Sequence, residues 1–248
     1  MFININNIKI NYIDTEIATN DDFTILLLHG WGADIRYFKT TIDVLKKKYR
    51  VIALDLPNFG LSDKLTKSFC VDDYCDIVVE FLEELKIKNV ALIGHSYGGR
   101  IIIKLNNRDL KNINIIKNVL IDSAGIKHKL SFIKKLKIKI YKILKFVICI
   151  IPIKKIFGSN DYKNATDVLR ETMIRSINED LTPILKNIKK ETLIIWGDKD
   201  IDTPIEDAKI MEREIKNSGL VILKNTAHFS FLEDEWTYVK VLESFFNL

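Results

Sequence analysis

The sequence predicts an α/β fold, with a mostly parallel sheet that carries helices on both of its faces. Short apolar runs, typical of strands buried on both sides, alternate with segments whose apolar residues recur at helical spacing. Parallel strands joined by helices produce this alternation. The chain has 248 residues and a hydrophobic content of 47%, which allows a large core in one large domain or two small ones.

The predicted elements follow one another along the chain. Residues 3–13 alternate apolar and polar side chains and indicate a hairpin of half-exposed strands. Buried strands are expected at 23–28, 51–54, 90–93, 119–121, 193–196 and 220–223. Helices are expected at 37–48, 71–85, 100–107, 205–215 and 236–246.

Residues 125–182 interrupt the alternation, because they contain no convincing strand. They consist instead of three helical stretches, of which the first is rich in lysine and the last covers 165–179. We interpret this segment as a helical cap inserted over the carboxyl edge of the sheet. The core domain would then consist of residues 1–124 and 183–248.

The cysteines and histidines restrict the possible classes of site. Three cysteines, Cys70, Cys75 and Cys149, form no CxxC pair, and none of the four histidines is spaced as a metal-binding pair. These counts argue against a disulfide framework and against a metal site, and they favour a reducing cytoplasm. The first residues lack a signal-peptide pattern, and no apolar run approaches the roughly 18 residues that span a bilayer.

The segment Gly94-His-Ser-Tyr-Gly98 matches the pattern GxSxG. It follows the predicted strand 90–93 and precedes a helix-compatible run that starts at Arg100. In this context the serine occupies a sharp, strained turn, and its hydroxyl stands clear above the sheet. The flanking glycines leave room for the neighbouring backbone. Ser96 is therefore a candidate nucleophile, and an ordinary strand-to-helix turn is the alternative.

A serine nucleophile needs a base, and only four histidines are available. His228 follows the last predicted strand in a loop that opens on the same sheet edge as Ser96. His95 adjoins the serine but points in another direction, His29 ends a different strand, and His128 lies in a cationic surround that discourages proton uptake. We choose His228 as the base, with a purely structural histidine as the alternative.

An acid must hold the base in the correct tautomer and stabilise its protonated form. The loop 196–204 follows a buried strand and contains three aspartates. Asp200 lies deep enough in this loop to turn back toward His228. Asp122, directly after strand 119–121, is the second candidate for the acid.

Acyl transfer places negative charge on a carbonyl oxygen, which needs preorganised hydrogen-bond donors. The segment His29-Gly-Trp-Gly32 follows the first buried strand. In this geometry the backbone N–H groups of Trp31 and Tyr97 can both face that oxygen. Taken alone, the segment also fits a plain strand-to-helix turn.

Together these motifs resemble the α/β-hydrolase superfamily. HGWG, the loop DLPNFGLS at 55–62, GHSYGG, WGDKD and TAHFSFLE occur in the family's order and cover nearly the whole chain. The resemblance implies an eight-stranded sheet, a helical cap after strand six and catalysis without a cofactor. It also implies Ser96 as nucleophile, Asp200 as acid and His228 as base. By the same resemblance, Trp31 and Tyr97 would be the oxyanion donors.

Some residues depart from the patterns of particular subfamilies. Asn58 stands where many members have glycine, and HGWG is neither the HGGG nor the HGGPG of other branches. A serine at the elbow, in place of aspartate, argues against epoxide hydrolases and dehalogenases. HGWG is similar to the segment found in pimeloyl-carrier-protein methyl esterases.

Lysines are concentrated in the predicted cap. Residues 123–157 contain ten lysines and no acid, so that with a net charge of +5 the rest of the chain carries 5 − 10 = −5. A solvated face and a composition bias would account for this, but the segment could also dock an acidic partner such as acyl carrier protein or an anionic lipid surface. No nucleic-acid partner is expected, because the sequence contains no motif of a known nucleic-acid-binding module.

We predict a serine hydrolase, most simply a carboxylesterase that acts on a small or medium hydrophobic ester through an acyl-enzyme. The alternatives are a C–C bond hydrolase or amidase of the same fold, and a ligand-binding receptor built on a hydrolase scaffold. Phe146, Phe157 and Phe229 are candidates for lining the substrate pocket.

Overall fold

The computed structural model describes residues 1–16, 23–127 and 166–248. These residues form an eight-stranded sheet in the order β1-β2-β4-β3-β5-β6-β7-β8. The strands are β1 (Phe2–Ile5), β2 (Ile8–Asp14), β3 (Thr24–Leu28), β4 (Val51–Leu54), β5 (Asn89–His95), β6 (Asn114–Ile121), β7 (Glu191–Gly197) and β8 (Ser218–Leu223). Strands β1 and β2 pair antiparallel, β2 joins β4 antiparallel, and the other neighbours are parallel, which confirms the predicted fold class.

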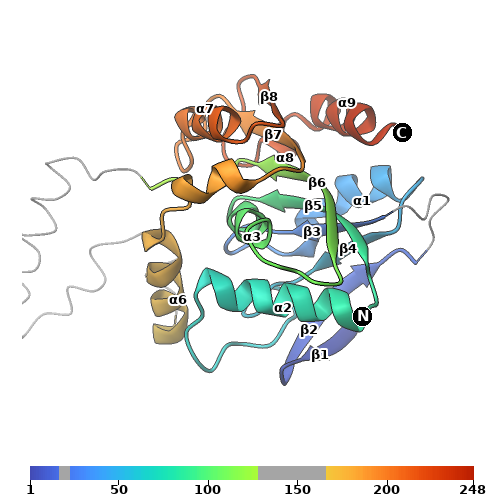
Figure 1. Cartoon of the computed structure of the whole chain (residues 1–248), viewed down its shortest axis with the longest axis vertical. Coiled ribbons are helices and arrows are strands. Elements are labelled where there is room, and N and C mark those ends of the chain that lie inside the picture. The colour runs from blue at the N-terminus through green and yellow to red at the C-terminus, as the bar shows by residue number, and fades with distance from the viewer. Residues whose placement is uncertain (17–22, 128–165) are drawn as a thin grey trace, which may run out of the picture.

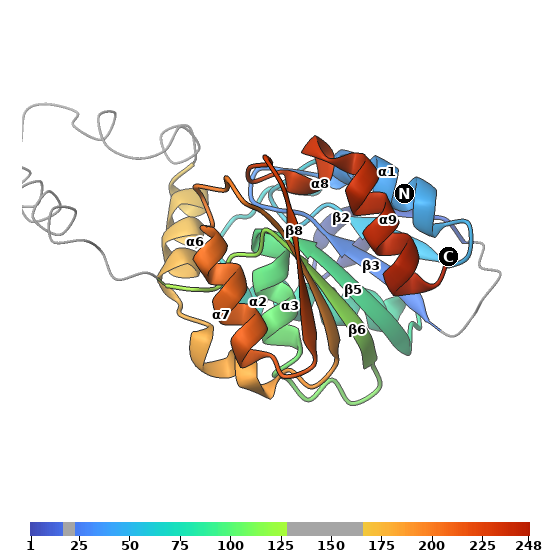
Figure 2. The same ribbon diagram turned by 90° about the horizontal axis from the view of Figure 1, so that it is seen from above.

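Helices cover both faces of this sheet (Figures 1 and 2). They are α1 (Lys39–Leu45), α2 (Val71–Glu84), α3 (Tyr97–Leu105), α6 (Asp167–Asn178), α7 (Ile205–Glu214), α8 (Ser230–Glu233) and α9 (Glu235–Phe246), with 3-10 turns η1 (Ile35–Phe38) and η3 (Thr182–Asn187). Seen from above, α1 and α9 lie on one side of the sheet and α2, α3 and α7 on the other (Figure 2). None of the described helices is long and apolar enough to cross a lipid bilayer.

Two apolar clusters hold these layers together, one on each face of the sheet. In β3 every residue is buried, and successive side chains point to opposite faces. Leu26 and Leu28 therefore pack into the cluster beneath α2, α3 and α7, whereas Ile25 and Leu27 pack into the cluster beneath α1 and α9. An apolar run without alternation is what a strand covered on both faces requires.

The predicted cap is described only at its two ends. The helix expected at 165–179 is α6, and the rest of the cap, 128–165, lies outside the described residues together with Phe146 and Phe157. The chain enters and leaves the segment at one place, because the Leu181 N–H donates to the Gly125 carbonyl at 2.9 Å.

Helix α6 is fixed to the core by buried hydroxyl groups. The Phe69 N–H donates to Thr172 Oγ1 at 3.0 Å, and the Tyr97 and Ser176 hydroxyls lie 2.9 Å apart. The contact to Tyr97 ties α6 to the first residue of α3. The division into a core and a cap remains a prediction.

Candidate active site

Ser96 occupies a strained turn between β5 and α3. Its φ of 49° and ψ of −105° lie outside the conformations that a residue with a side chain prefers. Such a residue costs on the order of 1–3 kcal/mol and persists only where its surroundings impose the conformation. Here the Ser96 N–H donates to the Ile121 carbonyl of β6 at 2.9 Å, which fixes the turn to the sheet.

The glycines around Ser96 are required by close backbone contacts. A Cβ atom at Gly98 would lie 2.0 Å from the Leu28 carbonyl oxygen, and one at Gly94 would lie 2.6 Å from the Gly98 carbonyl carbon. At Gly30, a Cβ would lie 3.2 Å from the Cβ of Ser96. The end of β3, the end of β5 and the start of α3 thus meet at distances that leave no space for side chains.

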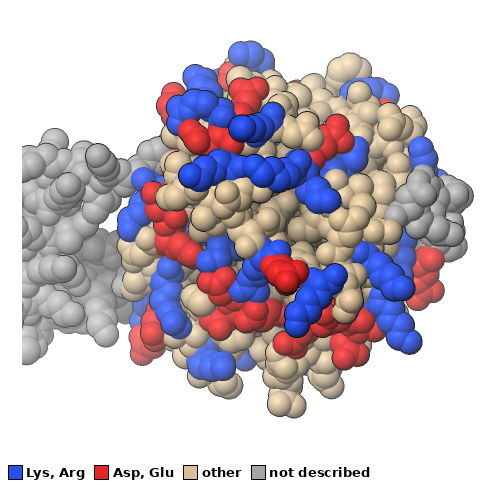
Figure 3. Space-filling view, viewed as in Figure 1, with Lys and Arg blue, Asp and Glu red and all other residues tan. Residues whose placement is uncertain are grey.

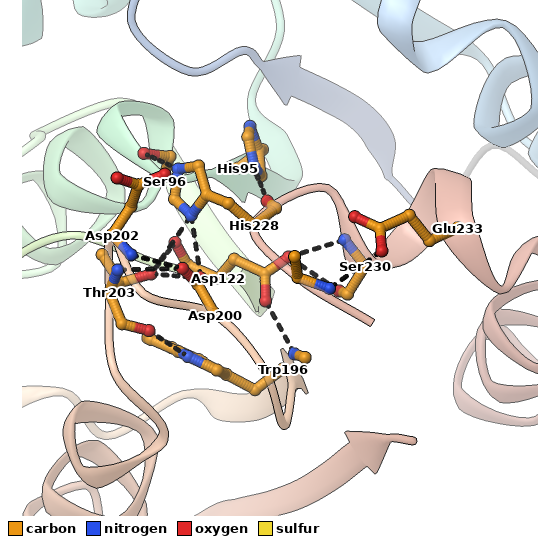
Figure 4. A network of polar contacts seen from close by, with 12 residues as sticks. His95, Ser96, Asp122, Trp196, Asp200, Asp202, Thr203, His228, Ser230 and Glu233 are labelled. Atoms are coloured by element: carbon orange, nitrogen blue, oxygen red, sulfur yellow. Dashed lines mark hydrogen bonds and ion pairs between the residues drawn. The ribbon is translucent and has the colours of Figure 1, made fainter. Parts of the chain in front are cut away.

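The three residues proposed for the reaction meet at the carboxyl edge of the sheet (Figure 4). His228 Nε2 lies 3.0 Å from Ser96 Oγ, and His228 Nδ1 lies 2.8 Å from Asp200 Oδ2. The residues come from loops after β5, β7 and β8, whose parallel pairing brings their carboxyl ends to one edge. A base in contact with both a hydroxyl and a carboxylate is the geometry of an activated nucleophile.

The hydrogen bonds define the protonation of this set. The ionised Asp200 carboxylate can only accept, so His228 carries its proton on Nδ1 and its Nε2 is free to accept the Ser96 proton. Asp200 Oδ1 also accepts from the Asp202 and Thr203 N–H groups, and Asp200 Oδ2 from the Thr203 hydroxyl at 2.7 Å. Burial alone would raise the pKa of Asp200, but the bonds from His228 and Thr203 outweigh it and lower that pKa.

The pKa of His228 is raised above its ordinary value of 6.5. Burial of the ring opposes protonation, but the hydrogen bond to Asp200 and the negative charge of that carboxylate favour it more strongly. Asp122 and Asp202 add smaller contributions in the same direction. A base with these neighbours can hold a proton during a reaction and release it afterwards.

Two other described histidines hold the loops around the site. His95 is buried, and its Nε2–H donates to the His228 carbonyl at 2.7 Å. Burial lowers the pKa of His95 to about 3, so the ring stays neutral. His29 donates from Nδ1 to the Gly30 carbonyl and accepts the Leu56 N–H at Nε2. Neither ring contacts Ser96 Oγ, as expected, and His128 lies outside the described residues.

The backbone N–H groups of Trp31 and Tyr97 are candidate oxyanion donors. In the described part of the chain, neither donates a hydrogen bond to a backbone or side-chain acceptor. Tyr97 is the first residue of α3, where N–H groups lack a helical partner and the helix dipole favours negative charge. The Trp31 ring packs edge-on against Tyr97, with ring centroids 5.3 Å apart.

Asp122, the second candidate for the acid, does not contact the His228 ring. Its Oδ1 accepts from the Gly197 N–H at 2.9 Å, and its Oδ2 accepts from the Ser230 hydroxyl at 2.7 Å. The structure therefore brings Asp200, and not Asp122, to the imidazole. The roles of Ser230 and Thr203 were missed at the sequence level. Thr203 lies only three residues after Asp200, but Ser230 is 108 positions from its partner and gives no local signal.

Phe229 lies beside the imidazole, with its ring centroid 5.7 Å from that of His228 and 5.4 Å from that of Tyr37. Of the three candidates Phe146, Phe157 and Phe229, it is the one that belongs to the described part of the chain. One group of potential metal ligands lies in the described residues, where atoms of Asp200, Asp202 and His228 fall within 4.8 Å of one another. Two of these atoms bond each other and Asp202 is exposed, so the group needs no ion to explain it.

The fold is that of an α/β hydrolase. A family model of the alpha/beta hydrolase fold matches residues 24–124, a range that begins with β3 and includes Trp31 and Ser96. This match and the fold support the assignment of the chain to the α/β-hydrolase superfamily, and its relatives, which are named as hydrolases and esterases, make it an enzyme of the hydrolase class.

Several relatives and solved structures are similar over most of the chain. An uncharacterized hydrolase of Bacillus subtilis, YugF, is 29% identical over 83% of this chain and 83% of its own length. A pimeloyl-[acyl-carrier protein] methyl ester esterase of Legionella pneumophila is 27% identical over 89% of this chain and 94% of its own. The structure of an esterase from Exiguobacterium antarcticum aligns with a TM-score of 0.77 and 24% identity, covering 100% of this chain and 99% of the other.

A membrane phospholipase A described as a bacterial virulence factor also aligns with a TM-score of 0.77, at 25% identity. This alignment covers 100% of the present chain and 85% of the phospholipase. Relatives with different named substrates thus share one arrangement of strands and helices, so the fold alone does not choose the substrate.

Proposed function

We propose that this chain is a carboxylesterase that cleaves small or medium hydrophobic esters, with Ser96, His228 and Asp200 as its catalytic triad. The observation that carries the proposal is the continuous hydrogen-bonded path from Ser96 Oγ through His228 to Asp200, with steps of 3.0 and 2.8 Å. A strained serine in contact with a base whose other nitrogen is held by an acid is suited to nucleophilic attack on an acyl group.

In the acylation step, Ser96 Oγ forms a bond to the ester carbonyl carbon while His228 Nε2 takes the hydroxyl proton. The carbonyl electrons move to oxygen, and the N–H groups of Trp31 and Tyr97 donate to that oxygen. The tetrahedral species then collapses, the bond to the leaving oxygen breaks, and His228 gives its proton to that oxygen. An alcohol departs and the acyl group remains on Ser96.

In the deacylation step, His228 accepts a proton from water, and the resulting nucleophile attacks the acyl carbon. Collapse breaks the bond to Ser96 Oγ, which recovers its proton from His228, and a carboxylic acid leaves. Asp200 stays ionised throughout and stabilises the protonated imidazole. The reaction consumes one ester and one water, and it yields one acid and one alcohol.

The apolar groups near Ser96 support a hydrophobic acyl substrate. The Trp31 ring packs between Phe59 and Tyr97, with ring centroids 5.1 and 5.3 Å away, and Phe229 lies on the His228 side. We propose that Phe146 and Phe157, outside the described residues, contribute further to this lining. The names of the relatives, among them an esterase and a methyl ester esterase, agree with an ester as the bond cleaved.

The test is turnover of p-nitrophenyl esters of graded acyl chain length. We expect multiple turnovers that are abolished in Ser96→Ala, and stoichiometric labelling of Ser96 by an organophosphonate. Binding with at most one acyl transfer per protein would indicate a receptor instead. Turnover of amides or of C–C substrates without ester turnover would indicate one of the other hydrolytic reactions.

A carrier-linked ester is a second candidate substrate, favoured by two observations. A relative 27% identical to this chain is named as an esterase of a pimeloyl-acyl-carrier protein. In addition, the ten lysines of 123–157 have no acidic neighbours in the sequence, whereas both signs of charge are interspersed on the face of the described core in Figure 3. We propose that these lysines attract an acidic carrier protein in the cytoplasm, by long-range charge.

Salt dependence tests this docking. Turnover of a carrier-linked ester should fall steeply as ionic strength rises, whereas turnover of a small neutral ester should not change, because screening weakens only the encounter of charged partners. Equal salt dependence of both substrates would remove the idea. Capture by anionic vesicles without capture by the carrier would point to a lipid surface instead.

A further inference from the structure

Asp122 lies at the carboxyl end of β6, between the loop that carries Asp200 and the loop that carries His228 (Figure 4). Its relative exposure is 0%, and its φ of 43° lies in the left-handed region that residues with side chains rarely occupy. Its carbonyl oxygen lies 3.1 Å from the Thr203 hydroxyl, which belongs to the Asp200 loop. The residue is thus held in an unusual conformation beside the site.

The Asp122 carboxylate joins two loops that are far apart in the chain. Oδ1 accepts from the backbone N–H of Gly197, the last residue of β7, at 2.9 Å. Oδ2 accepts from Ser230, at 3.1 Å from its backbone N–H and 2.7 Å from its hydroxyl. Gly197 lies three residues before Asp200, and Ser230 lies two residues after His228. The two oxygens of one carboxylate therefore link the loop that carries Asp200 to the loop that carries His228.

A second contact, from His95 of β5, also holds the His228 loop. The His95 Nε2–H donates to the His228 carbonyl at 2.7 Å, so the backbone of the base is held from β5 and from β6. The imidazole itself spans 3.0 Å to Ser96 Oγ and 2.8 Å to Asp200 Oδ2. A shift of the loop would lengthen at least one of these two contacts.

We propose that Asp122 is a positioning residue. Through its bonds to Ser230 and Gly197 it keeps the His228 imidazole within hydrogen-bond distance of both Ser96 and Asp200. The inference rests on the proposed function, because it concerns the placement of the base in that reaction. It assigns Asp122 no contact with the substrate.

Burial raises the pKa of Asp122 to about 7, and the hydrogen bonds from Ser230 and Gly197 favour the ionised carboxylate against that burial. All three bonds to the Asp122 side chain come from donors, two backbone N–H groups and one hydroxyl. A carboxylate offers acceptors on both oxygens, whereas an asparagine amide would place an NH₂ group against either Gly197 or Ser230. Asp122→Asn therefore keeps the size of the side chain and breaks one of the two connections.

The experiment compares the unmodified protein with Asp122→Asn on the alkaline plateau of the esterase rate. A base displaced by about 1 Å costs up to roughly 100-fold in rate, so we expect kcat to fall by about 10- to 100-fold. The KM should stay within about twofold, because the loop shift leaves the substrate surface in place. The rate of organophosphonate labelling of Ser96 should fall by the same factor as kcat.

Asn118→Ala is the matched control. Asn118 lies on β6, four residues before Asp122, is 1% exposed, and bonds Asn106 and also Thr192, which lies at the amino end of β7. Both substitutions break a buried polar network of β6, and both should lower the melting temperature. Only Asp122→Asn should slow the labelling of Ser96 when rates are expressed per folded molecule.

Ser230→Ala provides a second route, because it removes only the hydroxyl bond to Asp122. It should lower kcat in the same sense with KM unchanged, and its effect should be less than additive with that of Asp122→Asn. If Asp122→Asn fails to fold, Ser230→Ala alone decides the point. The inference would be overturned if kcat were unchanged in the folded variants. It would also be overturned if Asn118→Ala slowed the labelling of Ser96 as much as Asp122→Asn does.

The inference and the proposed function fail in different ways. If the unmodified protein neither turns over esters nor labels at Ser96, the proposed function is wrong and the positioning role falls with it. If the unmodified protein is active and the Asp122 variant labels at the same rate, the esterase stands and only the role of Asp122 is wrong.

Discussion

Asp198 and Asp200 lie two residues apart in one loop, yet their partners differ. Asp198 Oδ1 accepts from the Asn225 N–H at 2.7 Å and ties the loop to the chain after β8. Asp200 accepts from the His228 ring and from Thr203. Proximity in sequence therefore does not determine the role of these two aspartates. Their hydrogen-bond partners distinguish Asp198, which fixes the loop, from Asp200, which orients the imidazole.

Asp200→Asn should reduce kcat for p-nitrophenyl esters by about 10³- to 10⁴-fold, because an amide can hold His228 in the wrong tautomer without moving it. Steady-state kinetics with the same ester measure the loss. Asp198→Asn is the matched control in the same loop and should leave kcat within a few-fold. Comparable losses in both variants would indicate that the loop, and not the contact with the imidazole, matters.

The raised pKa of His228 sets the pH dependence of the reaction. Only the neutral imidazole accepts the Ser96 proton, so kcat/KM should be full above the pKa of His228 and fall as pH drops through it. Because Asp200 raises that pKa above 6.5, the acid limb should lie above 6.5. A pH profile with a neutral ester measures it. In Asp200→Asn, the residual activity should show this limb at lower pH, and an unmoved limb would contradict the assignment.

The candidate site could be predicted in part from single residues. Ser96, Asp200 and His228 each follow a buried strand, and the carboxyl ends of parallel strands share one edge, so their meeting follows from topology. The choice between Asp200 and Asp122 depends on which carboxylate reaches the ring. The Asp122 carboxylate is already bonded to donors of Gly197 and Ser230, so Asp200 is the carboxylate that contacts the imidazole. Periodicity carries no information about such long-range side-chain contacts.

At the scale of elements, the turn from β5 to α3 depends on close packing against β3. A Cβ at Gly98 would lie 2.0 Å from the Leu28 carbonyl oxygen, too close for the backbone to accept without moving. A shift of either element would carry Ser96 with it. Ser96 is thus positioned by a backbone contact between two elements and not by its own side chain.

Gly98→Ala should destabilise the protein by about 1–3 kcal/mol, the usual cost of overpacking, and should abolish labelling of Ser96. Denaturant unfolding and organophosphonate labelling measure the two effects. The matched control is Gly219→Ala on β8, where an added Cβ meets nothing within 4 Å. It should change stability by no more than about 0.5 kcal/mol. Normal labelling in Gly98→Ala would show that the contact can relax without moving the serine.

The boundaries of elements were predicted less well than their existence. Strand β6 begins at Asn114, five residues before the apolar run at 119–121, because the pairing of Lys117 and Asn118 with β7 does not need apolar side chains. The helix expected at 37–48 begins as a 3-10 turn and continues as α1. Asn58 adopts a φ of 81°, so an asparagine can occupy the turn where many family members have glycine.

At the scale of the whole molecule, the described residues before and after the predicted cap contact each other directly. The Leu181 N–H donates to Gly125 at 2.9 Å, and Lys127 Nζ donates to the Asn178 carbonyl at 2.7 Å, so the chain returns to its starting point after the insertion. Helix α6 is bonded to Phe69 and Tyr97, which both belong to the core. These contacts predict that the core and α6 hold their structure without residues 128–165.

A variant in which a Gly/Ser linker replaces residues 128–165 tests this directly. The linker must run the length of α6, twelve residues or about 18 Å, and a flexible chain of about 12 residues reaches that far. We expect cooperative thermal unfolding and labelling of Ser96 by a small organophosphonate, with turnover of long-chain esters lost because the proposed lining at Phe146 and Phe157 is gone. The same deletion in Ser96→Ala should not label. Loss of cooperative unfolding would mean that the segment belongs to the core, and unchanged chain-length preference would mean that it does not line the pocket.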